Sequence, residues 1–142
     1  MGSLLGSWGT AVSLRHVAIG PADTLFGIGE GVWLVYHYTL GGSLIASWGA
    51  GFVNSNTYGI DADADGTVFI SNYSNGTVHY FTSTGSHIGS VLNSFYHALD
   101  VALSNNGDRL YVGANGQNIY YFRRTETRVA PASLGKVKAL FR

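Results

Sequence analysis

Three aspartates alternate along one short stretch of the chain and end in a glycine, Asp61-x-Asp63-x-Asp65-Gly66. Alternating carboxylates followed by glycine open many calcium-binding loops, in which hard oxygen ligands surround a hard cation. Such loops also need a closing carboxylate, but this chain has Phe69 at the ninth position and Asn72 at the twelfth, where an EF-hand has its bidentate glutamate. We therefore expect Asp65-Gly66 to be a hairpin turn, and the sequence predicts no metal site and no cofactor.

A second set of polar and aromatic side chains recurs where the first strand of a repeat is expected to begin. His16, Tyr58 and His97 stand at equivalent places there, and Arg15 and Tyr96 directly precede two of them. One hypothesis is a ring of side chains that binds a sugar, a peptide or a small molecule. The simpler interpretation is a structural polar layer, in which neighbouring backbone carbonyls satisfy each imidazole and phenol.

An internal repeat defines the elements that must position these residues. The run Gly-Ser-Leu-Leu-Gly-Ser-Trp-Gly at residues 2–9 returns at residues 42–49 and, in weaker form, at residues 85–90, with spacings of 40 and 43 residues. A period of this length, built from short strands, is typical of the blades of a β-propeller. We therefore expect an all-β chain with about three four-stranded blades.

The strands of each repeat are separated by short turn sequences. In the middle repeat, β-rich runs at residues 58–63, 67–72, 77–82 and 87–91 alternate with turns such as Asp65-Gly66 and Asn75-Gly76. The first repeat predicts strands at residues 16–20, 24–29, 32–38 and 43–48. The third predicts strands at residues 97–104, 109–114 and 118–123 but has no clear fourth strand. Residues 3–8, in contrast, form a spare outer strand ahead of the first repeat.

Two stretches of this sequence are similar to known repeats. Residues 59–71, Gly-Ile-Asp-Ala-Asp-Ala-Asp-Gly-Thr-Val-Phe-Ile-Ser, together with residues 77–81, Thr-Val-His-Tyr-Phe, resemble an NHL-type repeat. Residues 104–115 resemble the related YVTN-type repeat. The resemblance covers residues 2–124 and implies a β-propeller, a fold that serves lyases, hydrolases and binding modules alike.

The end of the chain, residues 131–142, resembles the C-terminal tails of some bacterial surface or secreted repeat proteins. This resemblance implies an extracytoplasmic or secreted location. We expect no signal peptide within this sequence, because Met1 is followed at once by repeat sequence. The most apolar stretch, residues 32–38, is too short to span a bilayer, so no transmembrane segment is expected.

About three blades are too few to close a ring, since propellers have four to eight. We therefore divide the chain into a three-blade unit at residues 1–129 and a basic tail at residues 130–142. The open sheet faces have three possible solutions: the remainder of a longer chain, a solenoid with another cap, or self-association of two copies into a six-bladed ring. In that homodimer, residues 3–8 of each copy would complete the third blade of the other.

Composition excludes several classes of protein. The chain has 142 residues, no cysteine, 20 glycines and only 11% charged residues, which excludes a disulfide scaffold, a thiolate metal site and long solvated helices. Residues 1–122 carry two basic and seven acidic residues, whereas residues 123–142 carry six basic and one acidic residue. The body has no basic stripe, so we expect no nucleic-acid binding.

These observations favour a non-enzymatic binding or scaffold module for a protein or carbohydrate ligand. No nucleophile elbow and no phosphate-binding loop occurs, so no catalytic residue is predicted. The competing hypothesis is a metal-dependent lyase or hydrolase on a six-bladed propeller, for which one chain offers only His16, His97 and Asp100 as central ligands. A purely structural repeat is a third alternative. The ligand contacts predicted at the mouth of the channel are Arg15, His16, Tyr58, Tyr96 and His97.

Overall fold

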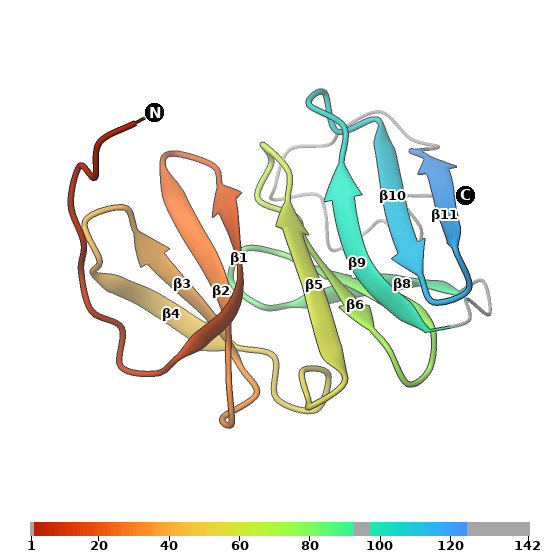
Figure 1. The fold of residues 1–142 in the computed structure, drawn as a ribbon, viewed down its shortest axis with the longest axis horizontal. Coiled ribbons are helices and arrows are strands. Elements are labelled where there is room, and N and C mark those ends of the chain that lie inside the picture. The colour runs from red at the N-terminus through yellow and green to blue at the C-terminus, as the bar shows by residue number, and fades with distance from the viewer. Residues whose placement is uncertain (1, 93–96, 125–142) are drawn as a thin grey trace.

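The computed structural model describes residues 2–92 and 97–124, and within these ranges the chain forms eleven strands in three antiparallel sheets (Figure 1). The first sheet has the order β1 (Leu14–Gly20), β2 (Thr24–Gly29), β3 (Val35–Thr39) and β4 (Leu44–Trp48). The second has the order β5 (Thr57–Ala62), β6 (Val68–Asn72), β7 (Thr77–Phe81) and β8 (His87–Leu92). The third has the order β9 (Ala98–Leu103), β10 (Arg109–Ala114) and β11 (Asn118–Arg123).

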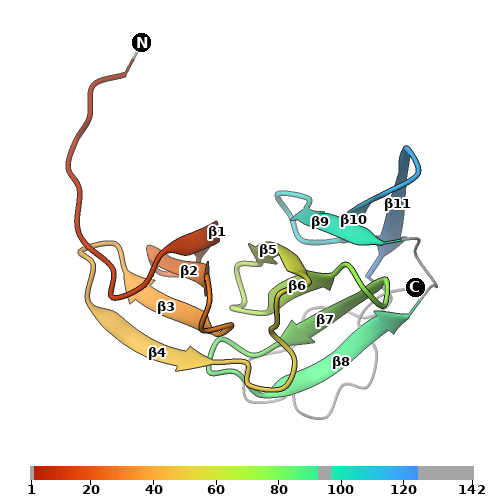
Figure 2. The same ribbon diagram turned by 60° about the horizontal axis from the view of Figure 1, so that its bottom comes forward.

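The three sheets stack as consecutive blades, and the predicted all-β propeller architecture is confirmed. The first strands β1, β5 and β9 are neighbours, and their arrows point toward the same end of the molecule (Figure 1). Figure 2 shows the outer strands β4 and β8 farthest from this row of first strands. Each blade is therefore an antiparallel meander that runs outward from the first strand.

Glycines at the predicted hairpin turns have the conformation that tight turns require. Gly66 and Gly76 have φ values of 83° and 61°, in the left-handed region that side chains with a Cβ rarely adopt. The Gly66 N–H donates to the Asp63 carbonyl at 3.0 Å and closes the β5–β6 turn. The hairpin interpretation of the acidic run is thus confirmed.

The third strand of the first blade begins later than its sequence predicts. The apolar run at residues 32–38 suggested a strand throughout, but β3 starts at Val35. Residues 29–34 instead form a turn, in which the Gly29 N–H donates to the Leu34 carbonyl and the Trp33 N–H donates to the Gly29 carbonyl. Gly31 and Trp33 have φ values of 79° and 51°, which is incompatible with extended backbone.

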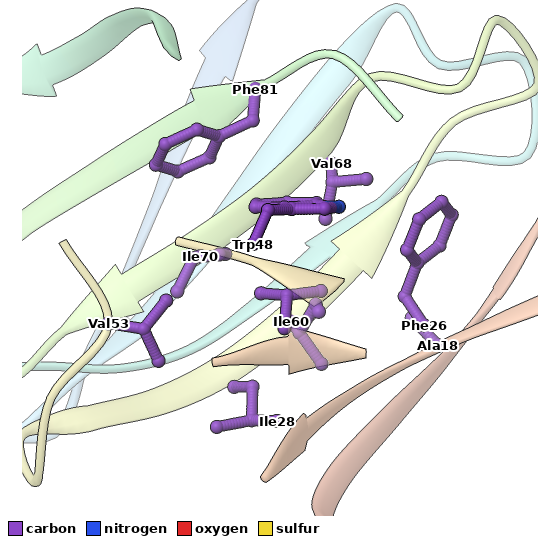
Figure 3. Packing of buried hydrophobic residues seen from close by; sticks show 10 residues of the cluster. Ala18, Phe26, Ile28, Trp48, Val53, Ile60, Val68, Ile70 and Phe81 are labelled. Carbon is purple, nitrogen blue, oxygen red and sulfur yellow. The ribbon is translucent and has the colours of Figure 1, made fainter. Parts of the chain in front are cut away.

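The apolar core consists of two layers, one on each side of the second blade. Within β6 all five residues are buried: Val68 and Ile70 face the first blade, whereas Phe69 faces the third. A strand that is covered on both faces needs apolar side chains at consecutive positions, which explains the apolar run at residues 68–70. Figure 3 shows the first layer, in which Trp48 of β4 packs with Phe81 of β7 at a ring-centroid distance of 5.1 Å.

The two terminal blades are covered on one face only. Val17 and Ile19 of β1 are 57% and 62% exposed, while Ala18 between them is buried in the first layer. Ile119 and Tyr121 of β11 are 74% and 71% exposed. Apolar side chains at this exposure mark surfaces that another blade would cover.

Residues 2–13 precede β1 and belong to no strand of this chain. The outer strand predicted at residues 3–8 would form only by pairing with a second copy of the chain. It therefore stays a prediction. The predicted tail at residues 130–142 lies outside the described residues. No helix in the described residues is long and apolar enough to cross a membrane.

Candidate functional site at the start of the first strands

Four side chains form a continuous row across the starts of the first strands of the three blades, which we call the aromatic row (Arg15, Tyr58, Tyr73 and His97). The guanidinium carbon of Arg15 lies 4.8 Å from the centre of the Tyr58 ring. The Tyr58 and Tyr73 ring centres are 5.4 Å apart, and those of Tyr73 and His97 are 4.1 Å apart at an interplanar angle of 12°. The arrangement combines a cation with three rings in contact, of which Tyr73 and His97 are stacked and Tyr58 is tilted against Tyr73, and all four side chains are half-buried.

Register shifts in the first strands of two blades determine the direction of the Arg15 and Tyr58 side chains. The β1–β2 register shifts between Leu14 and His16, and the β5–β6 register shifts between Thr57 and Ile60, so Arg15 and Tyr58 both lie at β-bulges. A bulge bends its strand and redirects the side chain, which is a common device beside binding sites. Both residues thereby reach the end of the molecule where the first strands begin.

A buried serine connects the backbone beside Tyr58 with the backbone of β9. Ser71 is fully buried in β6, and its hydroxyl oxygen accepts a hydrogen bond from the Gly59 N–H at 2.8 Å. The same hydroxyl donates to the Leu99 carbonyl at 3.3 Å. Ser71 therefore satisfies the bulged backbone beside Tyr58 and links it to the strand that follows His97.

His97 has an uncommon backbone conformation. Its φ is 57°, and its Nδ1 lies 2.9 Å from the Tyr73 carbonyl oxygen. Its own carbonyl accepts a hydrogen bond from the Asn115 N–H at 3.1 Å. A non-glycine residue in the left-handed region costs about 1–3 kcal/mol and persists where its surroundings fix it, so the ring is held against Tyr73.

The structure brings together three of the five contacts predicted from the sequence. Arg15, Tyr58 and His97 belong to the aromatic row, whereas His16 pairs with Ile28 in the β1–β2 ladder and joins none of the described ring contacts. Tyr96 lies outside the described residues. Sequence reasoning missed Tyr73, because it stands in the β6–β7 turn and only the folded blade brings it between Tyr58 and His97.

The acidic run ties the second blade to the third. The Asp61 carboxylate accepts hydrogen bonds from the Ala62 N–H at 2.8 Å and from the Leu103 N–H of β9 at 2.7 Å. Burial raises the pKa of Asp61, although both backbone hydrogen bonds act in the opposite direction. The Asp63 Oδ1 accepts hydrogen bonds from the Asp65 and Thr67 N–H groups at 2.9 and 3.0 Å. These carboxylates therefore stabilise the turn and the contact between blades.

An arginine completes this contact. Arg124 follows β11, and its Nη2 donates to Asp63 Oδ2 at 2.9 Å. The Arg124 and Asp63 side chains are 4% and 1% exposed, and Asp65 Oδ2 lies 3.6 Å from Arg124 Nη1. Within the described ranges, no group of three or more His, Cys, Asp or Glu side chains could hold a metal ion. The counter-charge of Asp63 and Asp65 is thus an arginine from the neighbouring blade.

Two histidines in third strands lie against aromatic rings, and the Nδ1 of His79 also lies 2.7 Å from the Ser90 hydroxyl oxygen. His37 is buried and stacks on Phe26 with ring centres 4.1 Å apart, and burial lowers its pKa. Burial also lowers the pKa of His79, and the nearby His87, 5.6 Å away between ring centres, lowers it further. Both rings are therefore favoured in the neutral form in the folded protein.

We expect the free energy of unfolding to fall as the pH drops below about 6.5. An unfolded histidine has a pKa of about 6.5, so the unfolded chain binds protons that folded His37 and His79 resist. Urea denaturation at a series of pH values between about 5.5 and 7.5 measures this slope. The double variant His37→Gln/His79→Gln should flatten it, whereas Leu40→Ala in the exposed β3–β4 turn should not. Equal slopes in the double variant and the parent would contradict this explanation.

Two cavities lie on the uncovered face of the third blade rather than at the aromatic row. One of about 260 Å³ is lined by Arg109, Tyr111, Tyr121 and Arg123. The other, of about 210 Å³, is lined by residues of all three strands, namely Asp100, Val101, Ala102, Tyr111, Gly113 and Ile119. In a complete propeller a following blade would cover this face, so we assign these cavities to blade packing.

Comparison with known proteins identifies the fold but no family. No family model matches the chain, and no curated protein sequence matches it. Solved β-propeller structures do match: Hsv2 of Kluyvelomyces marxianus aligns with a TM-score of 0.60 and 12% identity over 80% of this chain and 41% of its own. BamB of Moraxella catarrhalis aligns with a TM-score of 0.65 and 13% identity over 80% of this chain and 33% of its own.

Hydrazine synthase of Kuenenia stuttgartiensis gives a similar result, with a TM-score of 0.61 and 16% identity over 81% of this chain and 33% of its own. The chain thus spans between about a third and two fifths of the length of each of these propeller-containing proteins. Their strands and blades match in arrangement while their sequences have diverged, so the likeness concerns the fold. Within its described residues this chain is part of a β-propeller, with two four-stranded blades and one three-stranded blade.

Proposed function

We propose that this chain is a non-enzymatic propeller module that binds a carbohydrate at the aromatic row. The observation that carries the proposal is the unbroken contact from Arg15 through Tyr58 and Tyr73 to His97. Aromatic faces pack against the apolar faces of sugar rings, and a guanidinium offers several fixed donors to hydroxyl or carboxylate oxygens. A protein ligand, the alternative from the sequence, would use the same half-buried row.

The row lies at the end where the first strands begin, which in a closed ring would be one mouth of the central channel. Tyr73 and His97 lie in connections between strands, and loops held by a rigid scaffold are common places for binding residues. The bulges at Arg15 and Tyr58 and the fixed ring of His97 fit this expectation, because they place the side chains before any ligand arrives.

Binding to an array of neutral and acidic oligosaccharides, followed by calorimetry with the oligosaccharide that binds, tests this proposal. Tyr58→Ala is expected to weaken binding by about two- to tenfold, since one lost stacking contact is worth about 0.5–1.5 kcal/mol. Leu40→Ala is the control, because Leu40 is exposed in the β3–β4 turn at the opposite end of the blade. Binding that is equally strong in both variants would contradict the assignment.

The enzymatic alternative is tested separately by metal analysis of protein purified without chelator. Stoichiometric bound metal would overturn the non-enzymatic assignment. The similarity to NHL-type and YVTN-type repeats, a bacterial source and an extracytoplasmic location remain proposals that rest on the sequence resemblances alone.

The module is further proposed to complete its ring by self-association of two copies. Support comes from the two uncovered faces, which carry Val17 and Ile19 at one end and Ile119 and Tyr121 at the other. The alternative is that the remainder of a longer chain supplies the missing blades, since the similar solved proteins are longer. Light scattering of the purified chain distinguishes them, because a dilution-stable monomer would reject the homodimer.

A further inference from the structure

The N-terminal segment contacts the first blade in the way that β4 contacts the second. Trp8 lies 5.3 Å from Tyr38 between ring centres, and a Cβ on Gly42 would come within 2.7 Å of the Trp8 ring. Trp48 lies 5.1 Å from Phe81, and a Cβ on Gly85 would likewise collide with the Trp48 ring. Each tryptophan therefore fills a place that a glycine of the following blade leaves open.

The residues that receive the two tryptophans are equivalent in sequence. Tyr38 and Phe81 are 43 residues apart, as are Gly42 and Gly85, which equals the spacing between the second and third copies of the repeat. Trp8 and Trp48 occupy the same position in the first and second copies. Trp8 thus already sits where the outer strand of a preceding blade would place its tryptophan.

The pairing of outer strands follows one register in both complete blades. In the first blade Tyr36 pairs with Ser47 and His37 with Ala46, and the register shifts between His37 and Tyr38. In the second blade the residues 43 positions later pair in the same way, and the register shifts between Tyr80 and Phe81. The same register therefore predicts which residues of the third strand of another blade would pair with residues 3–8.

The third blade offers such a strand. In the described residues its sheet ends at β11, whose neighbour on one side is β10. Ile119 and Tyr121 of β11 are largely exposed, and so are Leu4 and Leu5 of the N-terminal segment, at 86% and 98%. Residues 3–8 have no sheet of their own, and the third blade has no outer strand among the residues that the structure describes, so the two are complementary.

These two features cannot meet within one chain. Figures 1 and 2 show the N-terminal segment beside the first blade and β11 at the opposite end of the row. A second copy related by two-fold symmetry brings both together twice, and the resulting six blades fall within the four to eight that close a ring.

We propose that residues 3–8 of each copy pair with β11 of the other copy and complete its third blade. This inference rests on the self-association proposed above and specifies the residues that make it. The register of the complete blades places Trp8 opposite Ile119 and Gly6 opposite Tyr121 of the partner. The pair would then cover the apolar face formed by Ile119 and Tyr121 with the first blade of the second copy.

A disulfide cross-link tests this register, because the chain has no cysteine of its own. The double variant Gly6→Cys/Tyr121→Cys places two thiols opposite each other across the proposed strand pair, within the separation of about 5.5 Å between Cα atoms that a disulfide needs. Mild oxidation should yield a covalent species of twice the chain mass. The control Gly2→Cys/Tyr121→Cys is four residues out of register and should stay uncrosslinked. Circular dichroism verifies that both variants fold.

Each outcome bears on a different part of the proposal. A covalent dimer from the in-register pair alone supports the exchange of residues 3–8. A dimer in which the in-register pair fails to cross-link, or in which both pairs cross-link equally, overturns the strand exchange and leaves self-association standing. A monomer overturns both, and a ladder of larger species overturns the closed ring. The oligosaccharide measurements with Tyr58→Ala are unaffected by these results, so failure of the ligand proposal is recognised separately.

Discussion

Replacing Arg124 with methionine is expected to lower the free energy of unfolding by about 3–5 kcal/mol, because it leaves a buried carboxylate without its counter-charge. Asp63 is 5% exposed, and its Oδ2 receives the Arg124 guanidinium at 2.9 Å. Methionine preserves much of the volume of the arginine stem but provides no donor. Urea denaturation monitored by circular dichroism at neutral pH measures the change.

Two further variants separate the lost ion pair from general disruption. Arg123→Met removes a charge from the neighbouring exposed position and should change stability by less than about 0.5 kcal/mol. The double variant Arg124→Met/Asp63→Asn removes the uncompensated charge, so it should recover part of the loss. A small effect of Arg124→Met alone would show that water or another group compensates Asp63, and would contradict the structural role given to this arginine.

Trp48→Ala is expected to destabilise the protein by about 3–5 kcal/mol, the usual cost of truncating a large buried aromatic side chain. The indole is 8% exposed, packs on Phe81 and fills the space beside Gly85. Its loss opens a cavity between the first two blades that their sheets cannot collapse to fill. Thermal unfolding followed by circular dichroism measures the effect.

A graded series makes this prediction specific. Trp48→Phe should cost much less than Trp48→Ala, because the indole N–H has no hydrogen-bond partner among the described residues and the ring contact with Phe81 is retained. Leu44→Ala in the same strand should be nearly neutral, since Leu44 is 53% exposed. If Trp48→Ala were as mild as Leu44→Ala, the packing between the first two blades would not depend on this residue.

Local sequence patterns were sufficient to predict the blades. Asp65-Gly66 and Asn75-Gly76 mark turns that the structure contains, and the strands at residues 109–114 and 118–123 begin and end where the pattern places them. Turn residues with positive φ and runs of β-branched or aromatic residues act over a few positions. The same patterns misplaced the start of β3, because the turn at residues 29–34 is built from apolar residues such as Val32 and Trp33.

Contacts between blades could not be predicted in this way. Arg124 reaches Asp63 across 61 positions of sequence, and nothing in the run around either residue indicates the partner. The aromatic row shows the same limit: the repeat aligned Tyr58 with His97, but Tyr73 joins them only because the β6–β7 turn lies beside His97, which directly precedes β9. Such contacts depend on how blades stack, and stacking geometry is set by the whole core.

The shared register of the first two blades also affects how chains recover from denaturation. Since Ser47 and Ser90 pair with their third strands in the same register, the backbone of an outer strand released from one blade can pair with the vacant edge of another. At high protein concentration the edge is often that of a different molecule, and exchange of outer strands then leads to domain-swapped oligomers and aggregates. Dilution favours the pairing of β4 and β8 within their own chain, so we expect the yield of renaturation to fall as the protein concentration during refolding rises.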